Sequence, residues 1–252
     1  MGEVEVRDAA TVVLLRDGAG GIEAWLLTRV KQMVFAAGMS VFPGGRVDDA
    51  DAGLPFSAGA AEAIAARFGC ADRLARQLLG AAVRETFEET GVLLSTPSAD
   101  LSGARTDVEA GRVSFGDLLR TNGLTIGADV LHPWSRWITP PGEVRRYDTR
   151  FFVGALPDGA EAQDVTSESS EASWVPVGAA LEQAQRGERG LMPPTLVTLS
   201  SLLAFSTVGE VLAAASTRSL DAISPAVRRD GNRYLAELPD GSSFELPKSL
   251  FA

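Results

Sequence analysis

Three glutamates, Glu85, Glu88 and Glu89, have the residue type and spacing in this chain that are most suited to chemistry. On a helix they share one face, because residues three and four apart are neighbours there. Carboxylates at that spacing repel one another, and a bound divalent cation reverses that penalty. Oxygen ligands of this kind favour Mg²⁺ or Mn²⁺, usually together with substrate phosphates. The alternative is a solvated acidic helix face, which is the usual role of a run of charges.

The residues around the glutamates predict the helix that carries them. Apolar side chains at residues 81–83 and at Phe87 can turn inward while the acids keep to the other face. Gly91 is placed to end the helix, since glycine tolerates the left-handed closing conformation. Residues 92–94 are Val-Leu-Leu and predict a buried strand directly after the helix.

A second segment, residues 41–51, changes the balance between these two interpretations. A short apolar strand runs into Pro43 and the paired glycines Gly44 and Gly45. Glycines let backbone carbonyls or amides approach a ligand closely. Asp51 follows six positions after Gly45 and adds a further carboxylate.

Together, residues 42–45 and 84–91 resemble the Nudix box of the Nudix hydrolases. The Arg-Glu, Glu-Glu and Gly positions of the second half match the family pattern. Two features depart from it, because Asp51 replaces the expected glutamate and residues 52–83 replace a short spacer. Thr86 also stands where the family usually carries an aliphatic residue. The long insert resembles that of the coenzyme A diphosphatases of the peroxisomal kind.

The resemblance implies an α/β fold, a Nudix-type α/β/α sandwich with a mixed sheet. It covers residues 5–185, with a helical insert at about 52–79. Residues 186–252 are predicted to form an extension packed on this domain, with a further helix from Pro194 and a hairpin. The hairpin signal is Asp240-Gly241 between two short apolar runs.

The resemblance also implies an activity, the metal-dependent hydrolysis of a P–O–P bond in a nucleoside diphosphate derivative. CoA or acyl-CoA is the favoured substrate, and NADH, nucleotide sugars or dinucleotides are the alternatives. A Nudix-fold module that binds a metabolite and regulates without hydrolysis is the second class of function. The intact glutamate triple favours the enzyme.

Roles for individual residues follow from the box. Glu85, Glu88 and Glu89 would hold Mg²⁺ or Mn²⁺ with a backbone carbonyl of Gly44 or Gly45. Arg84 is expected to orient the glutamates through ion pairs. The general base is either Glu85 or a loop acid before Trp174, for which we choose Glu168 over Glu171.

Cationic residues outside the box are candidates for binding substrate phosphates, because arginine matches phosphate oxygens with two donors. Arg29 closes a predicted strand just before the glycines, where a solvated strand end is an equal alternative. For the arginines of residues 145–150 the alternative is pairing with nearby acids. The predicted substrate-binding residues are Arg29, Phe42, Arg145, Arg146 and Arg150.

Composition limits the remaining possibilities. The chain has 252 residues and a net charge of −10, which argues against a nucleic-acid or anionic-membrane surface. The sequence contains no stretch of about 18 consecutive apolar residues, so no membrane span is expected. The single cysteine, Cys70, excludes an internal disulfide and fits a reducing cytosol. We therefore expect a cytoplasmic protein with a small diphosphate substrate, and the insert offers a surface for a possible homodimer.

Overall fold

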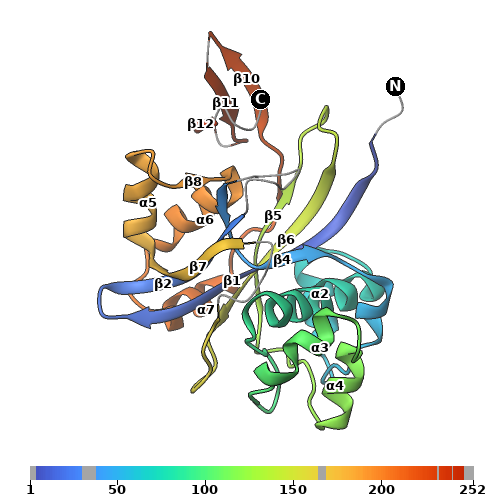
Figure 1. Cartoon of the computed structure of the whole chain (residues 1–252). Helices are drawn as coiled ribbons and strands as arrows, with labels where there is room; N and C mark the ends of the chain where they lie inside the picture. Colours follow the sequence, from blue (N-terminus) through green and yellow to red (C-terminus); the bar gives the residue numbers. More distant parts are fainter. Residues whose placement is uncertain (1–3, 30–37, 164–168, 232, 240, 247–252) are drawn as a thin grey trace.

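The computed structural model describes residues 4–29, 38–163, 169–231, 233–239 and 241–246. A nine-stranded sheet lies between two layers of helices, and a separate three-stranded sheet projects from one end (Figure 1). The α/β/α sandwich predicted from the resemblance is therefore confirmed.

The large sheet is mixed. Its order is β8-β3-β2-β1-β6-β5-β9, with β4 paired to β1 and β7 paired to β2. β1 runs parallel to β6 but antiparallel to β2 and β4. The strands are β1 (Val6–Gly18), β2 (Gly21–Arg29), β3 (Met39–Val41), β4 (Gly44–Arg46), β5 (His132–Ile138), β6 (Arg146–Ala155), β7 (Ser169–Pro176), β8 (Gly190–Leu191) and β9 (Ala222–Ile223).

Strand β1 shows why both faces of the sheet need a helical layer. Successive side chains of a strand point to opposite faces. Ala10, Val12 and Leu14 are buried in one apolar core, and Val13 and Leu15 are buried in the other. Such a strand is stable only when both of its faces are covered.

The two cores are closed by different helices. The first core contains side chains from α1 (Ala60–Phe68), α2 (Asp72–Thr90), α3 (Arg105–Glu109) and α4 (Phe115–Thr121). The second contains side chains from α5 (Val177–Gln185), α6 (Pro193–Leu202) and α7 (Val208–Ala215). Two 3₁₀ turns, η1 (Asp49–Gly53) and η2 (Ser102–Ala104), complete the helical elements of the described residues. The predicted insert is thus η1 in part, α1 and the first half of α2.

Three local features differ from the sequence expectation. Residues 92–94 are buried but are not a strand, because the N–H of Val92 donates to Thr90 Oγ1 (3.0 Å) rather than to a neighbouring strand. Helix α7 was not predicted. The predicted C-terminal hairpin, β11 (Arg233–Glu237) and β12 (Ser243–Leu246), gains a third strand, β10 (Ala226–Asp230). The boundary at residue 185 stays a prediction.

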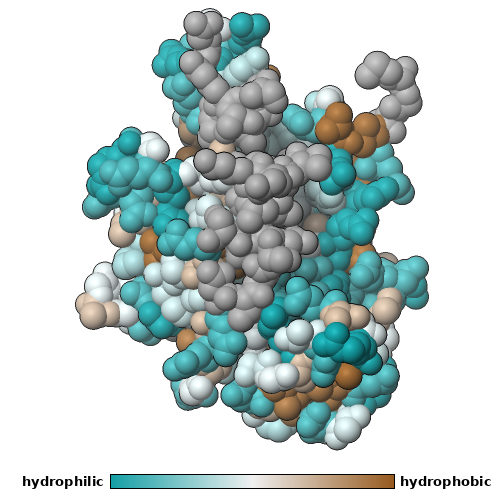
Figure 2. Space-filling view, in the orientation of Figure 1, coloured by the Kyte–Doolittle hydropathy of each residue, from teal (hydrophilic) through white to brown (hydrophobic). Residues whose placement is uncertain are grey.

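The surface visible in Figure 2 is mainly hydrophilic, with small apolar patches. The exposed large apolar side chains are Val4, Val6, Val144, Leu203 and Val227. No helix among the described residues is long and apolar enough to cross a membrane. The cytoplasmic location and the homodimer stay predictions.

Candidate active site

Helix α2 holds the three glutamates beside the sheet because its other face is buried and mainly apolar. Its inward side chains have at most 1% of their surface exposed, and they are Leu78, Leu79, Ala81, Ala82, Val83 and Phe87. Arg84, Glu85, Glu88 and Glu89 are half-buried at the edge of this face. Gly91 closes the helix with a φ of 75°, as its position in the sequence predicts.

Strand β4 brings the paired glycines directly against these carboxylates. The N–H of Gly44 donates to Glu89 Oε2 at 2.9 Å. A Cβ atom on Gly45 would collide with the carboxylate of Glu85, so any side chain there would displace that carboxylate. Behind them, Gly45 and Gly44 pair with Ala10 and Thr11 of β1. The predicted convergence of the glutamates with residues 44 and 45 is present.

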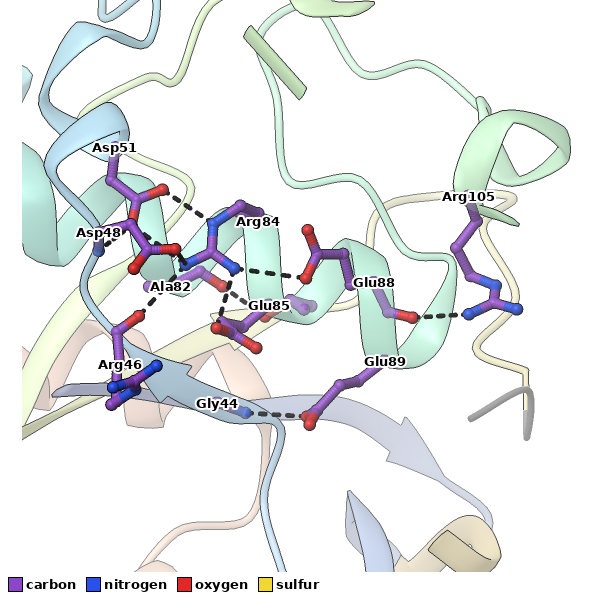
Figure 3. A network of polar contacts seen from close by, with 11 residues as sticks. Gly44, Arg46, Asp48, Asp51, Ala82, Arg84, Glu85, Glu88, Glu89 and Arg105 are labelled. Carbon is purple, nitrogen blue, oxygen red and sulfur yellow. Dashed lines mark hydrogen bonds and ion pairs between the residues drawn. The ribbon is translucent and has the colours of Figure 1, made fainter. Parts of the chain in front are cut away.

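Arg84 links Glu85 and Glu88 to each other (Figure 3). Its Nη1 donates to Glu85 Oε1 at 2.9 Å and to Glu88 Oε2 at 3.3 Å. Its Nε and Nη2 donate to the two carboxylate oxygens of Asp51 at 2.8 and 3.1 Å. Nη2 also donates to the Arg46 carbonyl at 3.2 Å. Arg84 thus forms ion pairs with Glu85 and Glu88, and its role in orienting the glutamates stays a prediction.

Asp51 anchors Arg84 from η1, despite the long insert that follows it. Its side chain is 2% exposed and also accepts from the N–H of Asp48 at 2.8 Å. Gly80 permits this arrangement, because a Cβ there would lie 2.6 Å from the Asp51 carbonyl oxygen. Asp51 therefore holds Arg84, and whether it acts as the box carboxylate is untested. We call Asp51, Arg84, Glu85, Glu88 and Glu89 the acidic cluster.

The acidic cluster holds more negative than positive charge. Asp51, Glu85 and Glu88 share the guanidinium group of Arg84. The pKa of Glu88 is raised to about 7, chiefly by burial, which outweighs the lowering effect of Arg84, and also by the charge of Glu85. Burial likewise raises the pKa of Glu85. Both carboxylates therefore lack full compensation of their negative charge.

The chemistry of the three glutamates suits a hard divalent cation. The half-buried carboxylates of Glu85, Glu88 and Glu89 supply the oxygen donors and surplus charge that Mg²⁺ and Mn²⁺ prefer. Within the described part of the chain, no three His, Cys, Asp or Glu side chains are grouped as ligands of one ion. Glu85, Glu88 and Glu89 instead accept hydrogen bonds from Arg84 and Gly44.

Comparison with known families follows the same residues. The family described as NUDT19 Nudix domain matches residues 70–202, more than half of the chain. The chain belongs to the NUDT19 Nudix domain family. The second half of the Nudix box, residues 84–91, lies inside the matched range, and the long-insert resemblance drawn from the sequence is confirmed.

Individual relatives agree with this assignment. A Caenorhabditis elegans protein named nudix hydrolase 7 is 30% identical over 203 residues, covering 78% of this chain and 60% of that protein. The acyl-coenzyme A diphosphatase NUDT19 of Gallus gallus is 29% identical over 280 residues, covering 85% of this chain and 72% of that protein. The human protein of the same name is 30% identical over 149 residues, 52% of this chain and 40% of its own length. The chain thus spans less than two thirds of the length of the Caenorhabditis elegans protein and of the human protein.

A solved structure supports the Nudix fold as well. The crystal structure of a Nudix hydrolase from Alicyclobacillus acidocaldarius aligns with a TM-score of 0.70 and 30% identity. The alignment covers 86% of this chain and 98% of that chain.

Some predicted site residues of this Nudix chain are placed differently or are not described. Glu168 and the side chain of Arg29 lie outside the described residues. The rival acid Glu171 is exposed on β7. Phe42 is only 3% exposed and packs in the second core, on the face of the sheet away from α2. This burial contradicts the substrate contact predicted for its side chain.

The predicted substrate arginines divide in a similar way. Arg145 is exposed, and Arg146 is buried with its Nε donating to the Thr139 carbonyl at 3.1 Å. Arg150 is 4% exposed, and its Nη1 contacts both Asp8 and Asp148. For Arg150 the structure shows pairing with acids, which is the alternative to substrate binding given in the sequence analysis. The roles of Arg145 and Arg146 stay predictions.

Arg150 belongs to a second charged group on the same face of the sheet. Arg136 donates from Nε and Nη2 to the two carboxylate oxygens of Asp148, at 2.9 and 2.7 Å. Arg150 contacts the same carboxylate at 3.2 Å. We call Asp8, Arg136, Asp148 and Arg150 the paired cluster.

Two polar residues in or near the box make contacts that the sequence did not predict. Thr86, which replaces the usual aliphatic residue, is fully buried and donates from its hydroxyl to the Ala82 carbonyl at 2.7 Å. Arg105 reaches from α3 to the Glu88 carbonyl at 2.8 Å (Figure 3). We expected only a polar loop there. No spacing in the sequence connects Arg105 to the box, so only the tertiary structure could reveal it.

Proposed function

We propose that this chain hydrolyses the P–O–P bond of a nucleoside diphosphate derivative with the help of Mg²⁺ or Mn²⁺. CoA or acyl-CoA is the favoured substrate. The observation that carries the proposal is the convergence of Glu85 and Glu89 on the backbone of Gly44 and Gly45. Membership of the NUDT19 Nudix domain family supports it, and two relatives are named acyl-coenzyme A diphosphatases.

The residues of the acidic cluster have distinct roles in this proposal. Glu85, Glu88 and Glu89, with a carbonyl of Gly44 or Gly45, would hold the divalent ion. When bound, the ion neutralises phosphate charge and lowers the pKa of a water. Arg84, anchored by Asp51, keeps the carboxylates of Glu85 and Glu88 in place.

Proton transfer is assigned to a glutamate. The water oxygen bonds to one phosphorus, the bridging P–O bond breaks, and two phosphomonoesters leave. Glu85 accepts the proton of the water, with Glu168 as the alternative base. A bound cation nearby would keep such a glutamate ionised, and so able to accept the proton.

Hydrolysis of a substrate panel tests this proposal. The purified chain is incubated with Mg²⁺ or Mn²⁺ and, separately, with acyl-CoA, CoA, NADH, a nucleotide sugar and a dinucleotide, and products are measured by mass spectrometry. We expect metal-dependent release of phosphomonoesters, fastest from acyl-CoA or CoA. Reaction in ¹⁸O-labelled water then identifies the phosphorus that is attacked. Binding of these compounds without any product would favour the non-catalytic regulator instead.

A further inference from the structure

The C-terminal end of α2 carries charges that oppose its own dipole. The last turn contains Glu88 and Glu89 and no basic residue. The C-terminus of a helix is its negative end, so carboxylates there are unfavourable and cations are favourable. The last four carbonyls of a helix also lack partners within the helix. The segment that presents the catalytic carboxylates therefore needs support from outside α2.

Backbone groups provide part of this support. The N–H of Gly91 donates to the Phe87 carbonyl at 2.8 Å. The N–H of Gln163, from the segment after β6, donates to the Thr90 carbonyl at 2.9 Å. Both donors are neutral and leave the excess of negative charge unchanged.

Arg105 provides the positive charge. It is the first residue of α3, and its side chain is buried, with 8% of the residue exposed. Its Nη1 donates to the Glu88 carbonyl at 2.8 Å and to Glu109 Oε2 at 2.9 Å. The guanidinium group thus lies at the helix end, where a basic residue of α2 itself would be favoured.

We propose that Arg105 is a positioning residue for the metal-binding carboxylates, an inference that rests on the proposed function of the acidic cluster. Arg105 fixes the backbone of Glu88, whose carboxylate accepts from Arg84. The next residue, Glu89, accepts from the N–H of Gly44. Holding one carbonyl therefore sets the direction of two neighbouring carboxylates. Arg105 itself acts through the backbone of Glu88 and not on the substrate.

Mn²⁺ affinity of the purified chain, measured by electron paramagnetic resonance, tests this proposal without reference to turnover. Arg105→Met removes the donor, and we expect Mn²⁺ to bind about tenfold to a hundredfold more weakly. Arg105→Lys keeps a cation and should recover part of the affinity. The matched control is Arg112→Met, because Arg112 is exposed and pairs with Asp107. This control should change Mn²⁺ affinity by no more than about twofold.

Amide hydrogen exchange separates positioning from general stability. We expect the Gly44 N–H to exchange faster in Arg105→Lys than in the unchanged chain, because Glu89 no longer holds it as firmly. If Arg105→Met does not fold, the Arg105→Lys protein decides the question by the same two measurements. Normal Mn²⁺ affinity together with normal exchange at Gly44 would overturn the proposal. A chain that binds Mn²⁺ in this Arg105-dependent way but hydrolyses nothing in the panel would instead overturn the proposed function alone.

Discussion

Two charged groups lie near strand β1 on the same face of the sheet, and they differ in charge balance. Gly45, Ala10 and Arg150 lie side by side in β4, β1 and β6, and β1 itself carries Asp8 of the paired cluster. In the paired cluster, two guanidinium groups meet two carboxylates. In the acidic cluster, Arg84 serves the carboxylates of Asp51, Glu85 and Glu88, while Glu89 accepts from a backbone N–H.

The difference separates a structural role from a chemical one. Buried charges are tolerated when they are matched by opposite charges, and the paired cluster balances two guanidinium groups with two carboxylates, although the buried Nε of Arg150 has no hydrogen-bond partner among the described residues. The acidic cluster has one guanidinium group for four carboxylates, and burial, together with the charge of Glu85, raises the pKa of Glu88 despite Arg84. A group that lacks positive charge can gain it from a divalent cation. We therefore expect changes in one cluster to alter activity and changes in the other to alter stability.

The largest effect is expected from Glu89→Gln. The substitution removes one negative charge while keeping the shape of the side chain that meets Gly44. We expect turnover to fall by about a hundredfold to a thousandfold. The free energy of unfolding of the metal-free protein should fall little, and circular dichroism with urea unfolding checks this. Near-normal turnover of the variant would discredit the role given to the acidic cluster.

Asp148→Asn likewise replaces a carboxylate by an amide, but in the paired cluster, and we expect it to alter stability rather than turnover. Arg136 and the buried Arg150 then share one fewer carboxylate. Breaking such a buried pair should lower the free energy of unfolding by about 3 kcal/mol. Urea unfolding measures the loss, and turnover per folded molecule at low temperature should stay near that of the unchanged chain. A large loss of turnover with unchanged stability would mean that the two clusters are not separate.

Gly45→Ala tests the close approach of β4 to Glu85. The added Cβ collides with the Glu85 carboxylate and displaces it. We expect turnover to fall about tenfold, equivalent to about 1.4 kcal/mol. Gly178→Ala in α5 is the matched control, since nothing lies within 4 Å of a Cβ there. Equal turnover for both variants would show that the position of Glu85 against Gly45 is unimportant.

A smaller effect should appear in the pH dependence of stability without metal. The pKa of Glu88 is raised from 4.5 to about 7 in the folded chain. Between these values the folded state keeps the proton that the unfolded state releases, so stability falls as pH rises. After screening, we expect a loss of about 1 kcal/mol across this window. Urea unfolding from pH 4.5 to 8 measures how the free energy of unfolding changes with pH. Glu88→Gln should flatten this dependence, and an unchanged dependence would contradict the raised pKa of Glu88.

Sequence reasoning reached the acidic cluster because its signals are local. The spacing of Glu85, Glu88 and Glu89 is a property of one helix, and Gly91 marks the end of that helix. The paired glycines precede a strand edge, where close approach of backbone is the usual reason for glycine. The helical insert, the β1–β2 hairpin and most of the C-terminal hairpin follow from the same kind of local pattern.

The paired cluster could not be found in this way. Arg150 and Asp8 are 142 residues apart and meet only because β1 and β6 are neighbours. Phe42 shows a related limit, because its place beside the glycines favoured a substrate contact, and the local pattern does not show that its side chain packs in the second core. Residues 92–94 are as apolar as a core strand, yet the Thr90 hydroxyl takes the first N–H after the helix.

The most direct test of the account is a calorimetric titration of Mn²⁺ into the metal-free protein at pH 8. We predict that the unchanged chain and Asp148→Asn bind Mn²⁺ alike, and that Glu89→Gln binds at least about tenfold more weakly. Equal Mn²⁺ binding by the unchanged chain and Glu89→Gln, or no binding by the unchanged chain, would contradict the claim that the acidic cluster is a metal site.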